Sequence, residues 1–317
     1  MNGLEKKRQL EKIIYDEVLP LIDRDYVLYG LPYYDNIGDI LIWDGEIELL
    51  KKSKYKCRGV CAWNEYPKTK LSQDILIIIT GGGYFGDLWR EAWNSVLEGI
   101  KNNKENKIIF MPNSIFYENE ELRASDAKYL EQFTKLSILV RDKASYDYAL
   151  KYFKNEVKLV PDMAFCMNES LIIRGIKKPA NKKILYLCRQ DKERSTSAVQ
   201  ILETDYDNSD WITIQKNMAA SYRFRRLLSY ASKTRRISNK IKLKIEHFLY
   251  RLFFRRFMTQ YGINQLSDYE KIISTRLHGM ILGLMLERNI KFIDNSYGKI
   301  KSYYDTWLTD CDNVKPF

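Results

Sequence analysis

Three side chains that can carry a positive charge lie near the C-terminal end of the sequence: Arg276, His278 and Lys299. The first two stand where an apolar helix, running from Met280 to Leu286, is predicted to begin. Unpaired backbone N–H groups and the helix dipole favour an anion at such a start, so the cluster predicts a phosphate or carboxylate site. The alternative is that Arg276 pairs with a structural acid and His278 is a hydrogen-bonded core histidine.

The residues around this cluster follow a strand, helix, strand order. Lys271 to Ile273 is a short apolar strand, and Ser274 and Thr275 are suitable N-caps for the helix. A second strand is expected from Ile290 to Asp294, and Lys299 follows it on a loop. Parallel sheets bind ligands at their carboxyl edge, which is where this loop would return.

The first half of the chain also alternates strands and helices, as a parallel α/β domain does. A strand from Asp25 to Leu31 leads into a turn that contains Asn36, Gly38 and Asp39 and starts a helix. Asp39 has two possible roles, because its carboxylate can cap this helix or accept a proton from a bound hydroxyl.

Four glycines follow the next predicted strand, Asp74 to Thr80: Gly81, Gly82, Gly83 and Gly86. Glycines at the end of a buried strand let the backbone approach a ligand closely. Their spacing also fits the dinucleotide pattern G-x-G-x-x-G, which requires an acid at the end of the following strand to hold a ribose. That strand, Lys107 to Met111, ends in Pro-Asn-Ser instead, so we exclude a nicotinamide or flavin site.

Two further residues are candidates at the same sheet edge. Ser114 lies on the loop expected after Met111 and could hydrogen-bond a ligand oxygen. Arg141 ends the strand predicted from Leu136 to Val140 and could bind an anion. The alternative for Arg141 is a surface ion pair with Asp142.

The length and composition indicate an enzyme-sized protein. Its 317 residues, 45% hydrophobic and 13% aromatic, suffice for two packed α/β domains, which we place at residues 1–175 and 176–317. No stretch approaches the roughly 20 apolar residues of a membrane span, and the charged N-terminus is not a signal peptide. The five cysteines lack metal-ligand spacing and are expected as reduced thiols in the cytoplasm.

A basic segment at about residues 222–258 interrupts the second domain. It holds twelve Lys and Arg residues and one acid, and this net +11 equals the excess charge of the whole chain. Its apolar and aromatic residues are spaced as in an amphipathic helix. Such a helix is typical of binding to anionic lipid head groups. Nucleic acid is the rival partner, and a solvated helix is the third alternative.

Taken together, the motifs resemble those of the polysaccharide pyruvyl transferases. They occur in the family's order between about residues 27 and 305. The matching pieces are DNIGDILI, GGGYFGDLW, PNSIFY, the pair Arg141 and Asp142 with Ser145, PDMAF, LCRQDKE, and STRLHG with Lys299 downstream. The basic segment is not part of this common pattern.

The resemblance implies two Rossmann-like domains that face each other across a cleft, as in GT-B glycosyltransferases. It implies transfer of a pyruvyl group from phosphoenolpyruvate to a sugar as a cyclic ketal, without a metal or cofactor. His278 would be the general acid, in preference to His247, the only other histidine. Asp39 and Arg276 would also be catalytic, Asp39 by acting on the acceptor hydroxyl and Arg276 by stabilising the departing phosphate. The residues that bind substrate would be Asn36, Gly38, Gly82, Gly83, Ser114, Arg141, Arg276 and Lys299.

We expect the acceptor to be linked to a polyprenyl diphosphate, and the basic segment to hold the enzyme at the inner face of the cytoplasmic membrane. Two other functions are open. A glycosyltransferase with a nucleotide-sugar donor would use the same fold and a basic cleft. A nucleic-acid-binding protein would use the basic segment, but would leave STRLHG and the glycine cluster without a role.

Overall fold

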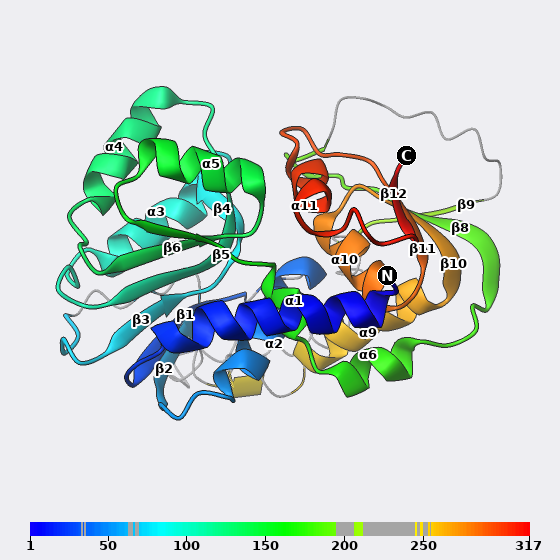
Figure 1. Ribbon diagram of the computed structural model, residues 1–317, viewed down its shortest axis with the longest axis horizontal. Coiled ribbons are helices and arrows are strands. Elements are labelled where there is room, and N and C mark those ends of the chain that lie inside the picture. Colours follow the sequence, from blue (N-terminus) through cyan, green and yellow to red (C-terminus); the bar gives the residue numbers. More distant parts are fainter. Residues whose placement is uncertain are drawn as a thin grey trace, which may run out of the picture.

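The computed structural model describes the 317-residue chain apart from residues 33, 35, 63–65, 67–69, 195–205, 212–244, 246, 247, 250–252 and 254. The described chain forms two sheets that lie side by side, each with helices packed on it (Figure 1). Their strands pair in parallel. The predicted α/β class with parallel sheets is therefore confirmed.

The first sheet contains seven strands in the order β2-β1-β3-β5-β6-β7, with β4 also paired to β5. They are β1 (Tyr26–Leu31), β2 (Cys57–Ala62), β3 (Leu76–Ile79), β4 (Gly82–Gly86), β5 (Ile108–Phe116), β6 (Leu136–Val140) and β7 (Glu156–Leu159). The helices between them are α2 (Ile37–Leu50), α3 (Arg90–Ile100), α4 (Glu120–Leu130) and α5 (Lys143–Tyr152).

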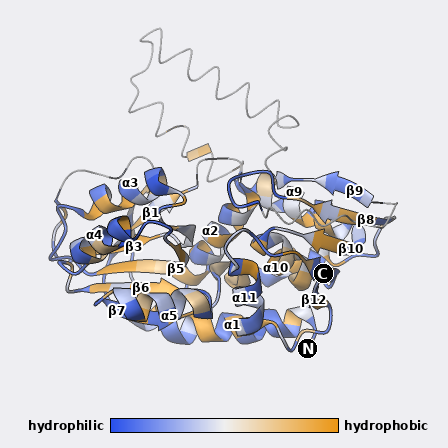
Figure 2. Cartoon of the chain, turned by 90° about the horizontal axis from the view of Figure 1, so that it is seen from above, coloured by the Kyte–Doolittle hydropathy of each residue, from blue (hydrophilic) through white to orange (hydrophobic). Residues whose placement is uncertain are grey.

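Strands β1 and β3 in the middle of this sheet are almost entirely apolar, as expected where helices cover both faces. Alternate residues of β1 and β3 point to opposite sides. Tyr29 and Ile77 pack in a core with residues of α3, α4 and α5, whereas Leu28 and Ile78 belong to a larger core that includes residues of α2. In Figure 2 the orange strands accordingly lie between helices that are blue on their outer sides.

The second sheet contains five strands in the order β12-β11-β10-β8-β9. They are β8 (Asn181–Leu187), β9 (Tyr206–Ser209), β10 (Tyr269–Ser274), β11 (Asn289–Phe292) and β12 (Val314–Pro316). The described helices that follow or separate them are α9 (Arg255–Ser267), α10 (Leu277–Met285) and α11 (Lys299–Trp307). The 3-10 turn η2 (Met163–Cys166) and α6 (Glu169–Gly175) connect the two sheets in sequence.

The N-terminal helix α1 (Gly3–Val18), which the 3-10 turn η1 (Leu19–Leu21) follows, links the two halves (Figure 1). Its start packs so tightly on α10 that a Cβ at Gly3 would lie 1.9 Å from the carbonyl oxygen of Leu284. Near its other end, Glu17 forms an ion pair with Lys158 of β7. The larger core likewise contains residues from both halves, from Leu10 to Val314. The domain boundary near residue 175 stays a prediction.

Two stretches predicted as loops are strands. Residues 112–116 continue β5, because β4 pairs with this extension from Gly82 opposite Asn113 to Gly86 opposite Phe116. Residues 194–210 are polar and acidic, which predicts a surface connection, but Tyr206–Ser209 form β9, which pairs with β8. The sequence also predicts a strand from Trp211 to Gln215. Of these residues the structure describes only Trp211, which is buried.

Two helix starts also differ from the prediction. Ser274 and Thr275 do not cap α10: its N-cap is Arg276, and the Ser274 hydroxyl bonds the backbone of that residue, accepting from its N–H at 3.1 Å. Lys299 is not on a loop but opens α11. Gly298 permits this start, because it adopts a left-handed φ of 85° that favours glycine.

Most of the basic segment at 222–258 lies outside the described residues. Three of its described phenylalanines are exposed: Phe248 by 61%, Phe253 by 62% and Phe257 by 52%. Arg255 pairs with Asp44 of α2 at 2.9 Å, so this end of the segment is attached to the first half of the chain. Within the part of the chain that the structure describes, no helix has the length and apolar character needed to cross a membrane.

Candidate active site

A cavity of about 470 Å³ opens where the carboxyl ends of strands from both sheets meet. Its walls include residues one or two positions after the ends of β1, β3, β6, β8 and β10. Eight of the predicted site residues line it: Asn36, Gly38, Asp39, Gly83, Arg141, Arg276, His278 and Lys299. Residues spread over most of the sequence therefore meet at the ligand edge expected for parallel sheets.

The start of α2 supplies the polar end of one wall. Asn36 is the N-cap of the helix, since its Oδ1 accepts from the Gly38 N–H at 3.0 Å. Asp39 is therefore not the cap; its Oδ2 accepts from the Asn36 side chain at 2.6 Å and from the Tyr34 hydroxyl at 2.9 Å. Two donors fix this carboxylate in the cavity wall, where it could accept a hydrogen bond from a substrate hydroxyl.

His278 is held by a buried carboxylate. Its Nε2 lies 3.2 Å from Oδ2 of Asp162, which is fully buried before the turn η2. The same oxygen accepts from Arg141 Nη1 at 2.7 Å. Burial alone would raise the pKa of Asp162, but the positive charges of protonated His278 and of Arg141 lower it well below its usual range. The ionised carboxylate can only accept, so the hydrogen bond requires a proton on Nε2 and fixes the orientation of the ring, which leaves Nδ1 for a substrate.

The ion pair of Arg141 differs from the surface pair that the sequence allowed. Arg141 is 1% exposed and pairs with Asp162, not with Asp142. Its Nε donates to Ser114 Oγ at 3.0 Å. The serine hydroxyl in turn donates to Asp142 at 2.7 Å. Ser114 thus supports Arg141 from behind and does not line the cavity.

The glycine cluster brings the two cations Arg141 and Lys299 together. A Cβ at Gly83 would lie 3.2 Å from Arg141 Nη2, 3.3 Å from Lys299 Nζ and 3.8 Å from the Tyr297 hydroxyl. Three donors thus converge on the space that a missing side chain leaves open. Such a space suits an anionic oxygen. Gly82 does not line the cavity.

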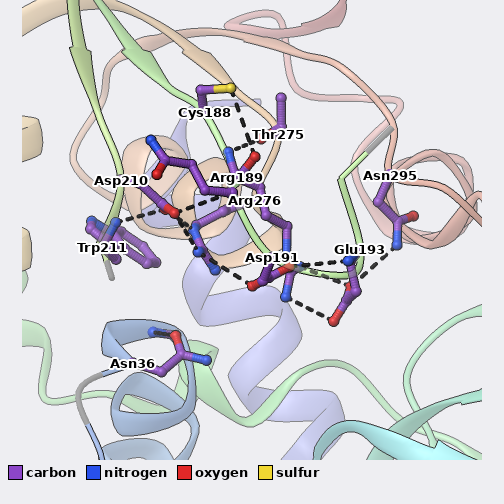
Figure 3. A network of polar contacts seen from close by, with 12 residues as sticks. Asn36, Cys188, Arg189, Asp191, Glu193, Asp210, Trp211, Thr275, Arg276 and Asn295 are labelled. Atoms are coloured by element: carbon purple, nitrogen blue, oxygen red, sulfur yellow. Dashed lines mark hydrogen bonds and ion pairs between the residues drawn. The ribbon is translucent and has the colours of Figure 1, made fainter. Parts of the chain in front are cut away.

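Arg276 is paired with acids, as one alternative predicted, and still lines the cavity. Its guanidinium contacts Asp210 through Nε and through Nη2, the latter at 3.0 Å, and approaches Asp191 at 3.5 Å. In Figure 3, Arg276 lies beside Arg189. Asp210 contacts Arg276, and Asp191 contacts Arg189 and lies near Arg276. Two contacts to one carboxylate fix the plane of the guanidinium, so Arg276 has one orientation toward a ligand.

Arg189 and Lys299 share a second buried carboxylate, that of Glu193. Figure 3 shows the contact between Glu193 and Arg189. Burial tends to raise the pKa of Glu193, but the charges of Lys299 and Arg189 lower it to about 2. For Lys299, burial is the largest influence and lowers its pKa to about 8, against the opposing effect of Glu193. Lys299 is thus mostly charged at neutral pH and titrates just above it.

A third buried acid, Glu46 of α2, lies behind the glycine turn. It accepts from the Gly81 N–H and from the Thr80 hydroxyl, both at 2.8 Å. Burial raises its pKa to about 7, and the nearby charge of Asp162 adds to this effect. Glu46 therefore fixes the backbone at the end of β3, which itself lines the cavity.

Several of these residues carried no predicted role. Asp162, Arg189 and Glu193 stand in PDMAF and LCRQDKE, stretches that contribute to the family resemblance but whose individual side chains were not assigned. Asp210 and Glu46 had no local signal. The cavity also has an aromatic lining that was not anticipated: Tyr34, Tyr66, Tyr84, Trp89 and Trp211. Within the described residues, no cluster of three or more His, Cys, Asp or Glu could hold a metal ion.

Comparison with known proteins gives a consistent result. The family model "Polysaccharide pyruvyl transferase" matches residues 36–297. The chain is 30% identical over 294 residues to "Putative pyruvyl transferase EpsO" of Bacillus subtilis (strain 168), covering 91% of this chain and 85% of that protein. It is 25% identical over 309 residues to "Pyruvyl transferase 1" of Schizosaccharomyces pombe, covering 90% and 70% respectively.

One solved structure has a similar fold. It is that of a functionally uncharacterized protein from Klebsiella pneumoniae, with a TM-score of 0.56 and 20% sequence identity. The match covers 99% of this chain and 98% of the other. At this identity the likeness supports the fold alone.

Proposed function

The chain belongs to the polysaccharide pyruvyl transferase family, and we propose that it transfers the pyruvyl group of phosphoenolpyruvate to two hydroxyls of one sugar, forming a cyclic ketal. The observation that carries this proposal is the convergence of His278, anchored by Asp162, with three cationic side chains in one cavity. Phosphoenolpyruvate requires a proton donor and binding groups for a phosphate and a carboxylate. This cavity supplies both.

In the proposed reaction, Nδ1 of protonated His278 gives a proton to the methylene carbon of the enol, and the double-bond electrons form the new C–H bond. A sugar hydroxyl attacks the carbon that bears the phosphate and loses its proton. The C–O bond to phosphate then breaks, and phosphate leaves with the bonding electrons. A second hydroxyl of the same sugar attacks this carbon, loses its proton and closes the ketal.

The cavity residues fit these steps. Arg141, Arg276 and Lys299 would hold the phosphate and carboxylate and stabilise the charge on the departing phosphate. Asp39 would accept the proton of the attacking hydroxyl, because its carboxylate is fixed by Asn36 and Tyr34 in the same wall. The aromatic lining suits the apolar face of a sugar ring. We further propose a GT-B-like arrangement of domains 1–175 and 176–317, supported by the position of the cavity at the carboxyl edges of both sheets.

We propose that the acceptor is linked to a polyprenyl diphosphate and that the enzyme binds the inner face of the cytoplasmic membrane. The support is the concentration of positive charge at residues 222–258 together with exposed Phe248, Phe253 and Phe257. Basic residues attract anionic head groups, at roughly 1 kcal/mol each near the surface, and aromatic side chains enter the interface.

A donor screen tests the reaction. The protein is incubated with phosphoenolpyruvate and candidate soluble or lipid-linked sugars, and the product is analysed by mass spectrometry together with released phosphate. The expected product carries the mass of one ketal-linked pyruvyl group per phosphate released. Product from nucleotide sugars, with none from phosphoenolpyruvate, would instead identify a glycosyltransferase.

A further inference from the structure

Six hydrogen-bond donors surround the carboxylate of Glu193. Arg189 donates to it from Nη1 and Nη2, both at 2.8 Å, and the ammonium of Lys299 pairs with it as well. Three neutral donors complete the set: Trp89 Nε1 at 3.1 Å, Asn295 Nδ2 at 3.2 Å and Tyr297 OH at 3.3 Å. A carboxylate offers about four lone-pair positions, so these six donors take up its whole acceptor capacity and hold it in one orientation.

The donors come from separate parts of the fold. Trp89 directly precedes α3 in the first half of the chain, Arg189 follows β8, and Lys299 opens α11. All three line the cavity, as does Glu193 itself, although Glu193 is only 2% exposed. The carboxylate therefore holds together three segments that would otherwise be placed independently. An anion beside Gly83 would meet the Lys299 ammonium in the orientation that Glu193 imposes.

Glu193 also raises the pKa of Lys299 and so favours its charged form. Burial lowers the pKa of Lys299 to about 8, the negative charge of Glu193 raises it, and the neighbouring cations Arg189 and Arg141 lower it. Tyr297 also faces the ammonium, but its own pKa is raised well above the ordinary value, so the phenol is neutral. Without Glu193 the lysine would be a buried amine between two cations. Its pKa would then be lower, and a larger share of the lysine would be neutral at physiological pH.

We infer that Glu193 is the positioning residue of the anion site: its carboxylate orients Arg189 and Lys299 toward the cavity and keeps the Lys299 ammonium charged. The identity of the anion rests on the proposed function. The charge state of Lys299 does not depend on the proposed function, and it can be measured in the absence of any substrate.

The first experiment follows the titration of Lys299 by NMR in the full-length protein labelled with [ε-13C]lysine, assigned with Lys299→Arg. The wild-type resonance is expected to titrate near pH 8. In Glu193→Gln the midpoint should move at least one unit toward acid, and in Glu193→Asp, which keeps the charge, it should stay close to the wild-type value. Glu131→Gln is the matched control, because it breaks an exposed Glu–Lys pair with Lys154 at 2.6 Å. An unchanged midpoint in Glu193→Gln overturns the inference.

The second experiment measures phosphoenolpyruvate binding by calorimetry from pH 6 to pH 10. Affinity should fall above about pH 8 in the wild type, and Glu193→Gln should bind about ten-fold more weakly at pH 9 for each unit that the Lys299 pKa moves. Glu193→Asp should weaken binding through position alone; wild-type affinity in this variant overturns the positioning role, even if Glu193→Gln does not fold. Absence of wild-type binding, with the titration shift present, contradicts the proposed donor and leaves the role of Glu193 intact.

Discussion

Gly38 and His278 touch across the junction between the two halves of the chain: a Cβ on residue 38 would lie 2.5 Å from Nδ1 of the imidazole. This is the ring nitrogen that the bond to Asp162 leaves for a substrate. Two stretches separated by most of the sequence, residues 36–39 and STRLHG, therefore form one surface. Gly38 is required by this contact, because any side chain would occupy the position of the ring.

Gly38→Ala should accordingly displace the imidazole and lower kcat by about ten-fold or more, since small misplacements of a catalytic group are costly. Gly59→Ala is the matched control: a Cβ there meets Val27 at an ordinary 3.7 Å. Steady-state kinetics of both variants and their Tm values check this expectation. Equal kcat in the two variants would show that the approach of residue 38 to His278 has no bearing on turnover.

His278→Gln should reduce kcat by about 10²-fold or more, the usual contribution of a general acid, with little effect on folding. Glutamine keeps a hydrogen bond to Asp162 but cannot deliver a proton to the enol carbon. Single-turnover kinetics with phosphoenolpyruvate measure the loss, and thermal unfolding provides the control. Turnover close to the wild-type rate would remove His278 from the proton-transfer step.

Gly83→Ala should raise KM for phosphoenolpyruvate more than it lowers kcat. The added methyl group would stand within 3.3 Å of both Arg141 Nη2 and Lys299 Nζ, in the space proposed for an anionic oxygen. A ten-fold rise corresponds to about 1.4 kcal/mol of lost binding. If only the KM of the sugar acceptor changed, the donor and acceptor parts of the cavity would be the reverse of those proposed.

Glu46 should make the protein less stable as pH rises. Burial raises its pKa in the folded state to about 7, from an ordinary value of 4.5. Its contribution is therefore fully present below about pH 4.5 and is lost as pH rises through 7, because the unfolded chain releases the proton first. Glu46→Gln should remove this slope, with a difference on the order of 3 kcal/mol between the ends of the window. Urea unfolding at pH 4.5 and pH 8 checks it, and an identical slope in both proteins would contradict it.

The protein should sediment with vesicles that contain anionic lipid at low salt, and Arg225, Arg226, Arg235 and Arg236 changed together to Glu should release it. Arg255 is left intact because it pairs with Asp44. Replacing Phe248, Phe253 and Phe257 with Ser should weaken binding even in vesicles that retain the charge. Activity on a soluble sugar should survive both sets of changes. Failure of the wild type to bind anionic vesicles at low salt would leave the lipid-linked acceptor without support.

The sequence alone determined which segments approach the ligand edge. Apolar strands, capping residues and glycines are local signals, so β6 was predicted with its observed bounds, and Arg141 and His278 were correctly placed at the ends of elements. The extension of β5 through Pro112 was not predictable, because it depends on pairing with β4. A proline and an asparagine read locally as a loop.

Only the tertiary structure decided which charges pair. The acid that anchors His278 is 116 residues earlier in the chain, and the one that holds Lys299 is 106 residues earlier. Neither distance leaves a periodic or spacing signal. Each pair arises because the carboxyl ends of separate strands meet at one edge, where burial removes water and makes an unpaired charge costly. The residue types that can do the chemistry are therefore visible in the sequence, whereas their partners and charge states follow from the packing of the two sheets.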